Sequence, residues 1–275
     1  MSGRLNRIRR QFDRSAAGGY ETHAAVQRTM AGHLAAGLPH PQGSDDVLEI
    51  GCGTGFLTGK LAAGAYRSVT ALDLAPSMLE AAGQRTAGLP ADIRFVLADV
   101  ERWAAEPARE AEYDLIVSSA CFQWLEHPAG TLGHLRGLLR PGGMLAFATF
   151  GPGTFRELHE AFARTYAALG LKPERHGLSF REPEEWQADL INAGFSRVRF
   201  ERFEQAELYT SVPEFLHAVK GVGASVSEAA GRPGLGSRRL FLDMFRRYEE
   251  RYGAPEGITA TYELVYFQAE QPCIM

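Results

Sequence analysis

Short apolar runs alternate with amphipathic runs between residues 46 and 150. The apolar runs predict strands at residues 47–50, 68–72, 93–97, 114–118 and 144–150. The amphipathic runs between them predict helices at residues 56–63, 76–85 and 129–139. Strands separated by helices imply right-handed crossovers and a parallel sheet. The segment therefore predicts an α/β fold, a Rossmann-like sheet with helices on both faces.

The pattern changes after Gly151. Helical periodicity predicts helices at residues 154–169, 184–193, 213–219 and 240–252. Alternating residues at 198–203 and an apolar run at 259–268 predict two strands, which we expect to pair with each other. The remaining helices around 151–180 and 206–256 then form a second layer that is inserted into the sheet or lies over it as a lid.

Composition excludes several classes of protein. The 275 residues are 45% hydrophobic and 23% charged, which is enough to build a full core. The formal net charge of −4 argues against a general nucleic-acid binder. No apolar stretch approaches the roughly 20 residues of a membrane span, and none follows the basic N-terminus as in a secretory signal. We therefore expect a soluble, cytoplasmic protein that does not bind membranes.

The three cysteines, Cys52, Cys121 and Cys273, show no metal-binding spacing. Their number is odd, and a chain of this length does not need disulfides to hold its core together. We expect three reduced thiols and no metal site.

A glycine-rich turn follows the first predicted strand in the sequence VLEIGCGTG. Gly51, Gly53 and Gly55 allow a sharp turn and a close approach of a ligand to the backbone, and the next helix offers free N–H groups. A nicotinamide or flavin fingerprint would need a third glycine at position 56, where Phe56 stands. The spacing therefore suits S-adenosylmethionine (SAM) better than a dinucleotide.

Polar residues follow the next three strands. Asp73 is placed to accept hydrogen bonds from both ribose hydroxyls, although it could instead cap the helix that begins near Pro76. Asp99 could accept from the adenine amino group or cap the turn at Glu101. Ser118, Ser119 and Ala120 would line the pocket near the methionine portion with their backbone and hydroxyls. These positions share one edge of the sheet, where open α/β sheets bind ligands.

The motifs together resemble class I SAM-dependent methyltransferases. They are VLEIGCGTG with Glu49, VTALDLAPSML with Leu74 and Met78, FVLADVE with Val100, YDLIVSSACFQWLEHP and LRPGGMLAFATF. The resemblance spans roughly 47–150. It implies SAM as cofactor, with these residues and the glycines and acids above around it.

Further segments resemble the malonyl-acyl carrier protein O-methyltransferases of biotin synthesis. The N-terminal QFDRSAAGGYETHAAVQ is similar to that family's first helix, in which the counterpart of Tyr20 closes over the cofactor. The family also has equivalents of Gln123-Trp124, of FATFGPGTFRELHEAF and of LHAVKGVGAS around Lys220. The resemblance implies that Gln123, Trp124 and Lys220 contact the substrate, which is malonyl-acyl carrier protein or malonyl-CoA. Gln123 and Trp124 could instead be core residues, and Tyr20 a hydrophobic staple.

The resemblance completes the predicted organisation of the chain. The expected parts are an N-terminal helical segment that closes over the cofactor (1–40), a SAM-binding core (41–150), a lid with a core helix and strand at about 183–204 (151–256), and a terminal strand (257–275).

Methylation of a carboxylate needs no general base, because a carboxyl group with a pKa near ~4 is already ionised at neutral pH. Catalysis would come from alignment and exclusion of water. An acidic carrier protein would need a basic face. Helical spacing places Arg238, Arg239, Arg246 and Arg247 on one side of the predicted helix, although a solvated face offset by nearby glutamates explains them equally well.

Three rival functions remain at this stage. One is a SAM-dependent methyltransferase of a free small carboxylic acid or quinone precursor. Another is a SAM-binding protein without catalytic activity. The third is a nucleotide-cofactor oxidoreductase, which the glycine spacing disfavours.

Overall fold

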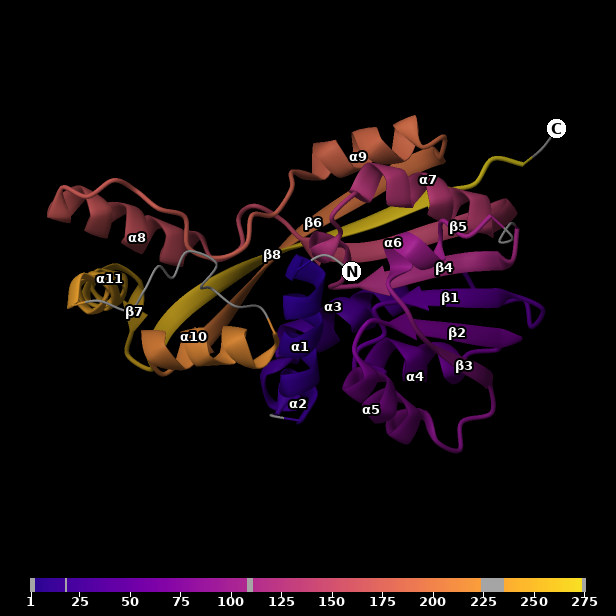
Figure 1. Cartoon of the computed structure of the whole chain (residues 1–275), viewed down its shortest axis with the longest axis horizontal. Helices are drawn as coiled ribbons and strands as arrows, with labels where there is room; N and C mark the ends of the chain where they lie inside the picture. The colour runs from indigo at the N-terminus through magenta and orange to yellow at the C-terminus, as the bar shows by residue number, and fades with distance from the viewer. Residues whose placement is uncertain (1–2, 18, 108–110, 224–234, 274–275) are drawn as a thin grey trace.

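The computed structural model describes residues 3–17, 19–107, 111–223 and 235–273 (Figure 1). The strands are β1 (Asp46–Ile50), β2 (Ser68–Asp73), β3 (Asp92–Leu97), β4 (Tyr113–Ser119), β5 (Leu139–Phe150), β6 (Ser196–Tyr209), β7 (Gly253–Ala254) and β8 (Gly257–Glu270). The helices before β5 are α1 (Gly3–Ala17), α2 (Tyr20–His23), α3 (Ala25–Ala36), α4 (Phe56–Ala62), α5 (Pro76–Thr86), α6 (Val100–Trp103), the 3-10 turn η1 (Phe122–Trp124) and α7 (Pro128–Leu138). Those after it are α8 (Arg156–Leu169), α9 (Pro183–Asn192), α10 (Val212–Gly221) and α11 (Leu235–Tyr252).

The central sheet has the strand order β3-β2-β1-β4-β5-β8-β6. Neighbouring strands from β3 to β5 are parallel, and β8 runs antiparallel to both β5 and β6. The predicted α/β, Rossmann-like fold is confirmed. The chain proceeds from β1 to β2 on one side and returns to β4 on the other, so the order reverses between β1 and β4. Such a reversal opens a crevice at the carboxyl ends of the strands, where ligands bind in this architecture.

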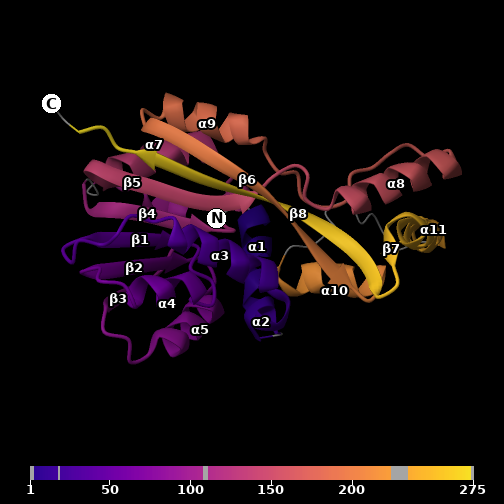
Figure 2. The same cartoon turned by 180° about the vertical axis from the view of Figure 1, so that it is seen from behind.

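Both faces of the sheet are covered, as parallel strands require. Alternate residues of β1 point to opposite sides: Val47 packs with α3 and α4, whereas Leu48 and Ile50 pack with α6, α7 and α9. Seen from behind, α3 and α4 lie across the sheet (Figure 2). This double cover fixes the positions of the strand ends that build the site.

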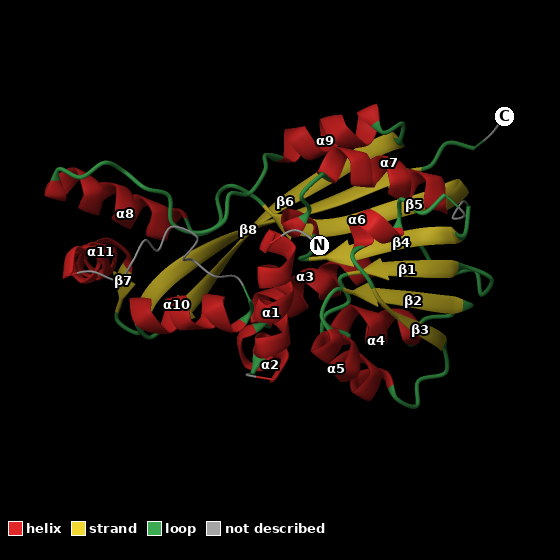
Figure 3. Ribbon diagram, in the orientation of Figure 1, coloured by secondary structure: helices red, strands yellow, loops and turns green. Residues whose placement is uncertain are grey.

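The last two long strands continue beyond the sheet. Strand β5 ends with the pair Phe150–Leu264, but β6 and β8 stay paired as far as Tyr209–Ile258. Helices α8, α10 and α11 pack on this extension around a core of their own, in which Phe215, Met244 and Tyr248 are fully buried (Figure 3). These helices are therefore attached to the end of the sheet and do not cover its face. The predicted strands 198–203 and 259–268 do pair with each other, but both were too short. In β6 the extension contains Glu204 and Glu207, which interrupt the apolar pattern.

Strand β5 also begins earlier than predicted. Residues 140–143, between the predicted helix at 129–139 and the predicted strand at 144–150, belong to β5, whose pairing with β4 is irregular between Tyr113 and Leu115. A Cβ on Gly143 would lie 2.9 Å from the carbonyl oxygen of Arg140, so only glycine fits this close approach. All three cysteines are free thiols. Among the described residues, no helix combines the length and apolar character needed to cross a membrane.

Candidate functional site

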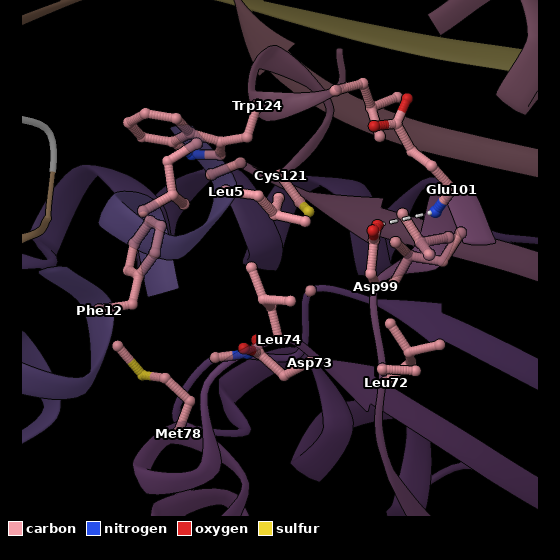
Figure 4. Close-up of a pocket in the computed structure, with 18 of the residues that line it drawn as sticks. Leu5, Phe12, Leu72, Asp73, Leu74, Met78, Asp99, Glu101, Cys121 and Trp124 are labelled. Carbon is pink, nitrogen blue, oxygen red and sulfur yellow. Dashed lines mark hydrogen bonds between the residues drawn. The ribbon is translucent and has the colours of Figure 1, made fainter. Parts of the chain in front are cut away.

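A cavity opens at the carboxyl ends of β1, β2 and β4, at the reversal of the strand order. It encloses about 770 Å³ of empty space, counted with its open mouth. Phe12 and Trp124 face it from one side, with Asp73 and Asp99 on the others (Figure 4). Its lining also includes Leu5, Ile8, Tyr20, Ile50, Gly51, Gly53, Leu72, Leu74, Met78, Ala98, Val100, Glu101, Ser119, Ala120, Cys121 and Leu125. The volume falls in the range of small-molecule sites.

The three glycines after β1 have positive φ angles of 69°, 53° and 81° for Gly51, Gly53 and Gly55. Their surroundings differ. A Cβ on Gly51 would lie 2.5 Å from the sulfur of Cys121, and one on Gly55 would lie 2.8 Å from Cα of Ala82. A Cβ on Gly53 would meet nothing within 4 Å. Gly51 and Gly55 thus permit close packing, whereas Gly53 leaves open the space that a ligand would fill.

Asp73 ends β2 and points into the cavity. Its Oδ2 accepts a hydrogen bond from the N–H of Gly53 and its Oδ1 from that of Ala75, each at 2.9 Å. Burial raises the pKa of the Asp73 carboxyl, while these backbone donors oppose the shift. An ionised carboxylate has about four acceptor positions, so two remain for hydroxyl donors.

Asp99 caps a helix and also lines the cavity. Its Oδ1 accepts from the N–H of Glu101 at 3.1 Å and caps α6, and the same side chain lines the cavity. The apolar residues Leu74, Met78 and Val100 line the cavity as well. An acceptor among apolar side chains suits a flat heterocycle that carries an amino group.

A smaller pocket adjoins the first on the other side of the glycine turn. Tyr20, Gly51 and Gly53 line both, and Glu49 lines the smaller one alone. Glu49 Oε2 and Ser119 Oγ are buried there without a hydrogen-bond partner among the described residues. Burial raises the pKa of Glu49 to about 8. Unpaired buried acceptors are costly, so this pocket is built for a cationic or hydrogen-bonding group.

The N-terminal helices cover the cavity. Leu5, Ile8 and Phe12 of α1 line it, and the ring of Phe12 meets Trp124 edge-on at 5.6 Å between centroids. Asp13 Oδ1 accepts from the hydroxyl of Ser77 at 2.7 Å, which ties α1 to α5.

A second tie holds α2. Glu21 accepts from the hydroxyl of Thr54 in the glycine turn and pairs with Arg85 of α5 at 2.7 Å. Burial raises the pKa of the Tyr20 hydroxyl well above its ordinary value, so this side chain stays neutral where it borders both pockets. The N-terminal segment is thus fastened to the two elements that carry the cofactor motifs.

The predicted role of Ser118 is corrected. This residue is fully buried, and its hydroxyl donates to the carbonyl oxygen of Ile50 at 2.9 Å. Its neighbour Ser119 lines the cavity instead, because successive residues of a strand point to opposite faces.

Lys220 is also not in the cavity: it is exposed on α10 and lines neither pocket. The adjacent glycines carry the contact. A Cβ on Gly221 would lie 2.4 Å from His23, and one on Gly223 would lie 2.7 Å from Phe12. The segment therefore packs against the N-terminal helices through the two glycines that follow Lys220.

Gln123 and Trp124 diverge although they are adjacent. Trp124 faces the main cavity, whereas Gln123 faces a separate recess. The Nε2 of Gln123 donates to the carbonyl oxygen of Ala120 at 2.8 Å. Ala120 has a φ of 53°, a strained value for a residue with a side chain. It borders the main cavity and the smaller pocket beside the glycine turn.

The arginines of α11 lie outside the cavity. Arg238 and Arg239 are exposed. Arg246 pairs with Asp243 and Glu250, and Arg247 pairs with Asp243, at distances from 2.7 to 2.9 Å. Acids of the same helix thus offset two of the four.

The sequence did not single out Leu5, Ile8 and Phe12 of α1, which line the cavity. They are spaced by three and four positions, which is the signal of one helical face. That periodicity indicates a buried face but not what it covers.

Comparisons with known proteins place this geometry in a family. Residues 48–147 match the family model described as "Methyltransferase domain". The chain is 48% identical over 275 residues to the malonyl-[acyl-carrier protein] O-methyltransferase of Paenibacillus sp. (strain JDR-2), covering 97% of this chain and 99% of the relative. It is 44% identical to the protein of that name from Brevibacillus brevis, covering 91% of each. Among solved structures, a proposed methyltransferase of Bacillus halodurans C-125 covers 89% of this chain and 99% of its own with a TM-score of 0.62; at 14% identity this likeness shows the fold alone.

Proposed function

The chain belongs to the malonyl-[acyl-carrier protein] O-methyltransferase family, and we propose that it methylates the free carboxylate of malonyl-acyl carrier protein with SAM, at the start of pimeloyl synthesis for biotin. The observation that carries the proposal is the pairing of Gly53 with Asp73 in a cavity at the strand reversal. There the open side of a glycine and a carboxylate acceptor face the same space.

The residues of the two pockets fit SAM part by part. Asp73 would accept from the ribose hydroxyls, and Asp99 from the adenine amino group against Leu74, Met78 and Val100. Glu49 and Ser119 would receive the amino-acid end, with Tyr20 over it. When bound, SAM would supply an electrophilic methyl group to a carboxylate oxygen, and its sulfur would keep the electron pair of the broken sulfur–methyl bond, so that no proton transfer would be needed.

The protein's contribution is positioning and exclusion of water. The acceptor carboxylate is already ionised, so no residue has to act as a base. The apolar face of α1 and Trp124 shield the cavity from solvent. Holding two reactants in the correct relative position can lower the activation free energy by up to roughly 7–11 kcal/mol. The lining fits this task, because its acids are placed to hold the cofactor.

An acidic carrier protein requires a basic surface. On α11, Arg238 and Arg239 are exposed, whereas Arg246 and Arg247 already have acidic partners. A carrier-protein face on α11 would therefore depend mainly on Arg238 and Arg239, and the exposed arginines Arg7, Arg10 and Arg14 of α1 form a second basic surface.

The test is a methyl-transfer assay with labelled SAM and three acceptors: malonyl-acyl carrier protein, malonyl-CoA and free malonate. We expect methyl ester on the carrier-bound malonyl group. Transfer to malonate alone, with none to the thioesters, would support the rival methyltransferase of free acids. SAM binding by calorimetry without transfer to any of the three would support a non-catalytic SAM-binding protein.

A further inference from the structure

A second recess lies beside the cofactor cavity, on the other side of η1. It encloses about 470 Å³ of empty space, counted with its mouth. Leu125 lines both spaces, while Gln123 faces the recess and Trp124 faces the cavity. The remaining lining residues are Arg4, Phe122, Pro128, Thr149, Phe150, Ser179, Arg181 and Trp186. The two spaces are thus neighbours, separated by a single turn of chain.

Arg181 is held in one orientation in this recess. Its guanidinium stacks on the ring of Trp186 at 4.5 Å from the centroid, and its Nη2 pairs with Asp189 at 2.7 Å. Its Nη1 is buried and has no hydrogen-bond partner among the described residues. This nitrogen is a buried donor on a permanently charged guanidinium that is held in place. A carboxylate is the acceptor that best fits the charge and geometry of an arginine.

Other donors surround the same space. Arg4 enters from α1 and forms no ion pair with any residue that the structure describes. The hydroxyl of Thr149 donates to Oε1 of Gln123 at 3.2 Å, which fixes the amide so that its nitrogen is the remaining donor. That nitrogen also bonds to Ala120, which borders the cofactor cavity. The recess is therefore cationic and rigidly joined to the cofactor site.

We propose that this recess binds the acceptor, the carboxyl end of a short dicarboxylic half-thioester, and that Arg181 is the residue that selects for the carboxylate. The inference rests on the proposed function and deepens it. One carboxylate oxygen pairs with Nη1 of Arg181, and the other stays free for the reaction.

The charge balance sets the expected kinetics. Methylation neutralises the carboxylate, so an arginine stabilises the bound substrate more than the transition state. Asp189 offsets part of the charge of Arg181 and keeps this attraction moderate. Loss of Arg181 should therefore raise KM far more than it lowers kcat. The neutral ester then has no ion pair to hold it, which favours its release.

The decisive variant is Arg181→Met, with Arg175→Met as the matched control. Arg175 lies on the same loop and is exposed, and its Nη2 donates to the carbonyl oxygen of Leu178 at 3.4 Å. Calorimetry in the presence of S-adenosylhomocysteine compares malonyl-CoA with acetyl-CoA, which lacks the carboxylate. We expect Arg181→Met to weaken malonyl-CoA binding tenfold or more, with acetyl-CoA and SAM binding unchanged. The Arg175 variant should behave as the wild type.

Because Arg181 also stacks and pairs within the fold, Arg181→Lys serves as a second variant. It keeps the charge beside Asp189 and should retain part of the preference for malonyl-CoA. The proposal is overturned if either variant folds and keeps the full preference, or if malonyl-CoA and acetyl-CoA weaken equally. These binding experiments are independent of the activity assay. A wild type that forms no methyl ester would refute the proposed function. The preference for malonyl-CoA over acetyl-CoA tests the role of the recess.

Discussion

The backbone N–H of Gly53 donates to Oδ2 of Asp73 at 2.9 Å, which joins the turn after β1 to the end of β2. The bond connects two elements that the sequence separates by the whole of α4. It holds the carboxylate beside the glycine whose missing side chain opens the cavity. The turn and the acid therefore act as one unit, and changing either should alter cofactor binding.

The substitution Asp73→Asn should weaken SAM binding strongly. Asparagine keeps an acceptor for Gly53 but removes the negative charge and one acceptor for the ribose hydroxyls. We expect a loss on the order of 2–3 kcal/mol, measured by calorimetry. Asp92→Asn is the control and should bind SAM normally, because Asp92 is the exposed first residue of β3, at the edge of the sheet away from the cavity. Unchanged affinity in a folded Asp73 variant would remove Asp73 from the site.

Substitutions of two glycines in the same turn should have different effects. Gly53→Val should abolish SAM binding in a protein that still folds, because its side chain enters open space; the strained φ should cost roughly 1–2 kcal/mol of stability. Gly55→Ala should lower the melting temperature more, because its Cβ would press on Ala82. Thermal melting and calorimetry on both variants separate the effects. Normal SAM binding by a folded Gly53→Val variant would contradict the proposal that this turn binds the cofactor.

Glu49 should make stability depend on pH. Its pKa is about 8 in the folded protein and 4.5 in its ordinary state, so the folded form holds the proton more tightly. The neutral carboxyl therefore adds its full contribution to the free energy of unfolding below pH 4.5. This contribution is lost as the pH rises toward 8. Glu49→Gln should remove this dependence and unfold less readily than the wild type at pH 9, by on the order of 3–5 kcal/mol. Urea titrations of both proteins at pH 5 and pH 9 measure their free energies of unfolding. The prediction is contradicted if the difference between wild type and variant is the same at both pH values.

The sequence predicted the lining of the main cavity best where a feature follows a strand directly, as Gly53 and Asp73 do. The glycine turn and Asp73 depend on local chain geometry, which a single segment reveals. The choice between Ser118 and Ser119 depends on which face of β4 each presents, and adjacent serines in a buried strand give no signal of that. The recess around Arg181 combines residues from α1, η1, β5 and the loop before α9, which only tertiary structure brings together.

Two arginine-bearing helices compete as the docking surface for an acidic carrier protein. On α1, Arg7, Arg10 and Arg14 are exposed, at spacings that place them on one side of the helix. The opposite side of α1 carries the apolar residues that roof the cavity. Within the part of the chain that the structure describes, these three arginines form no ion pair, in contrast to Arg246 and Arg247 on α11.

We therefore expect charge reversal on α1 to slow carrier-protein docking more than charge reversal on α11. Arg7→Glu with Arg10→Glu should raise KM for malonyl-acyl carrier protein several-fold and leave SAM affinity unchanged. Arg239→Glu with Arg246→Glu should have a smaller effect, because Arg246 already pairs with two acids. Added salt should raise the wild-type KM for the carrier substrate, since screening shortens from ~8 Å at physiological ionic strength to ~3 Å at 1 M. Kinetics on malonyl-CoA provide the control, because a small thioester needs neither surface. A larger effect from the α11 pair would assign docking to α11, and equal losses on both substrates would indicate damage to the fold.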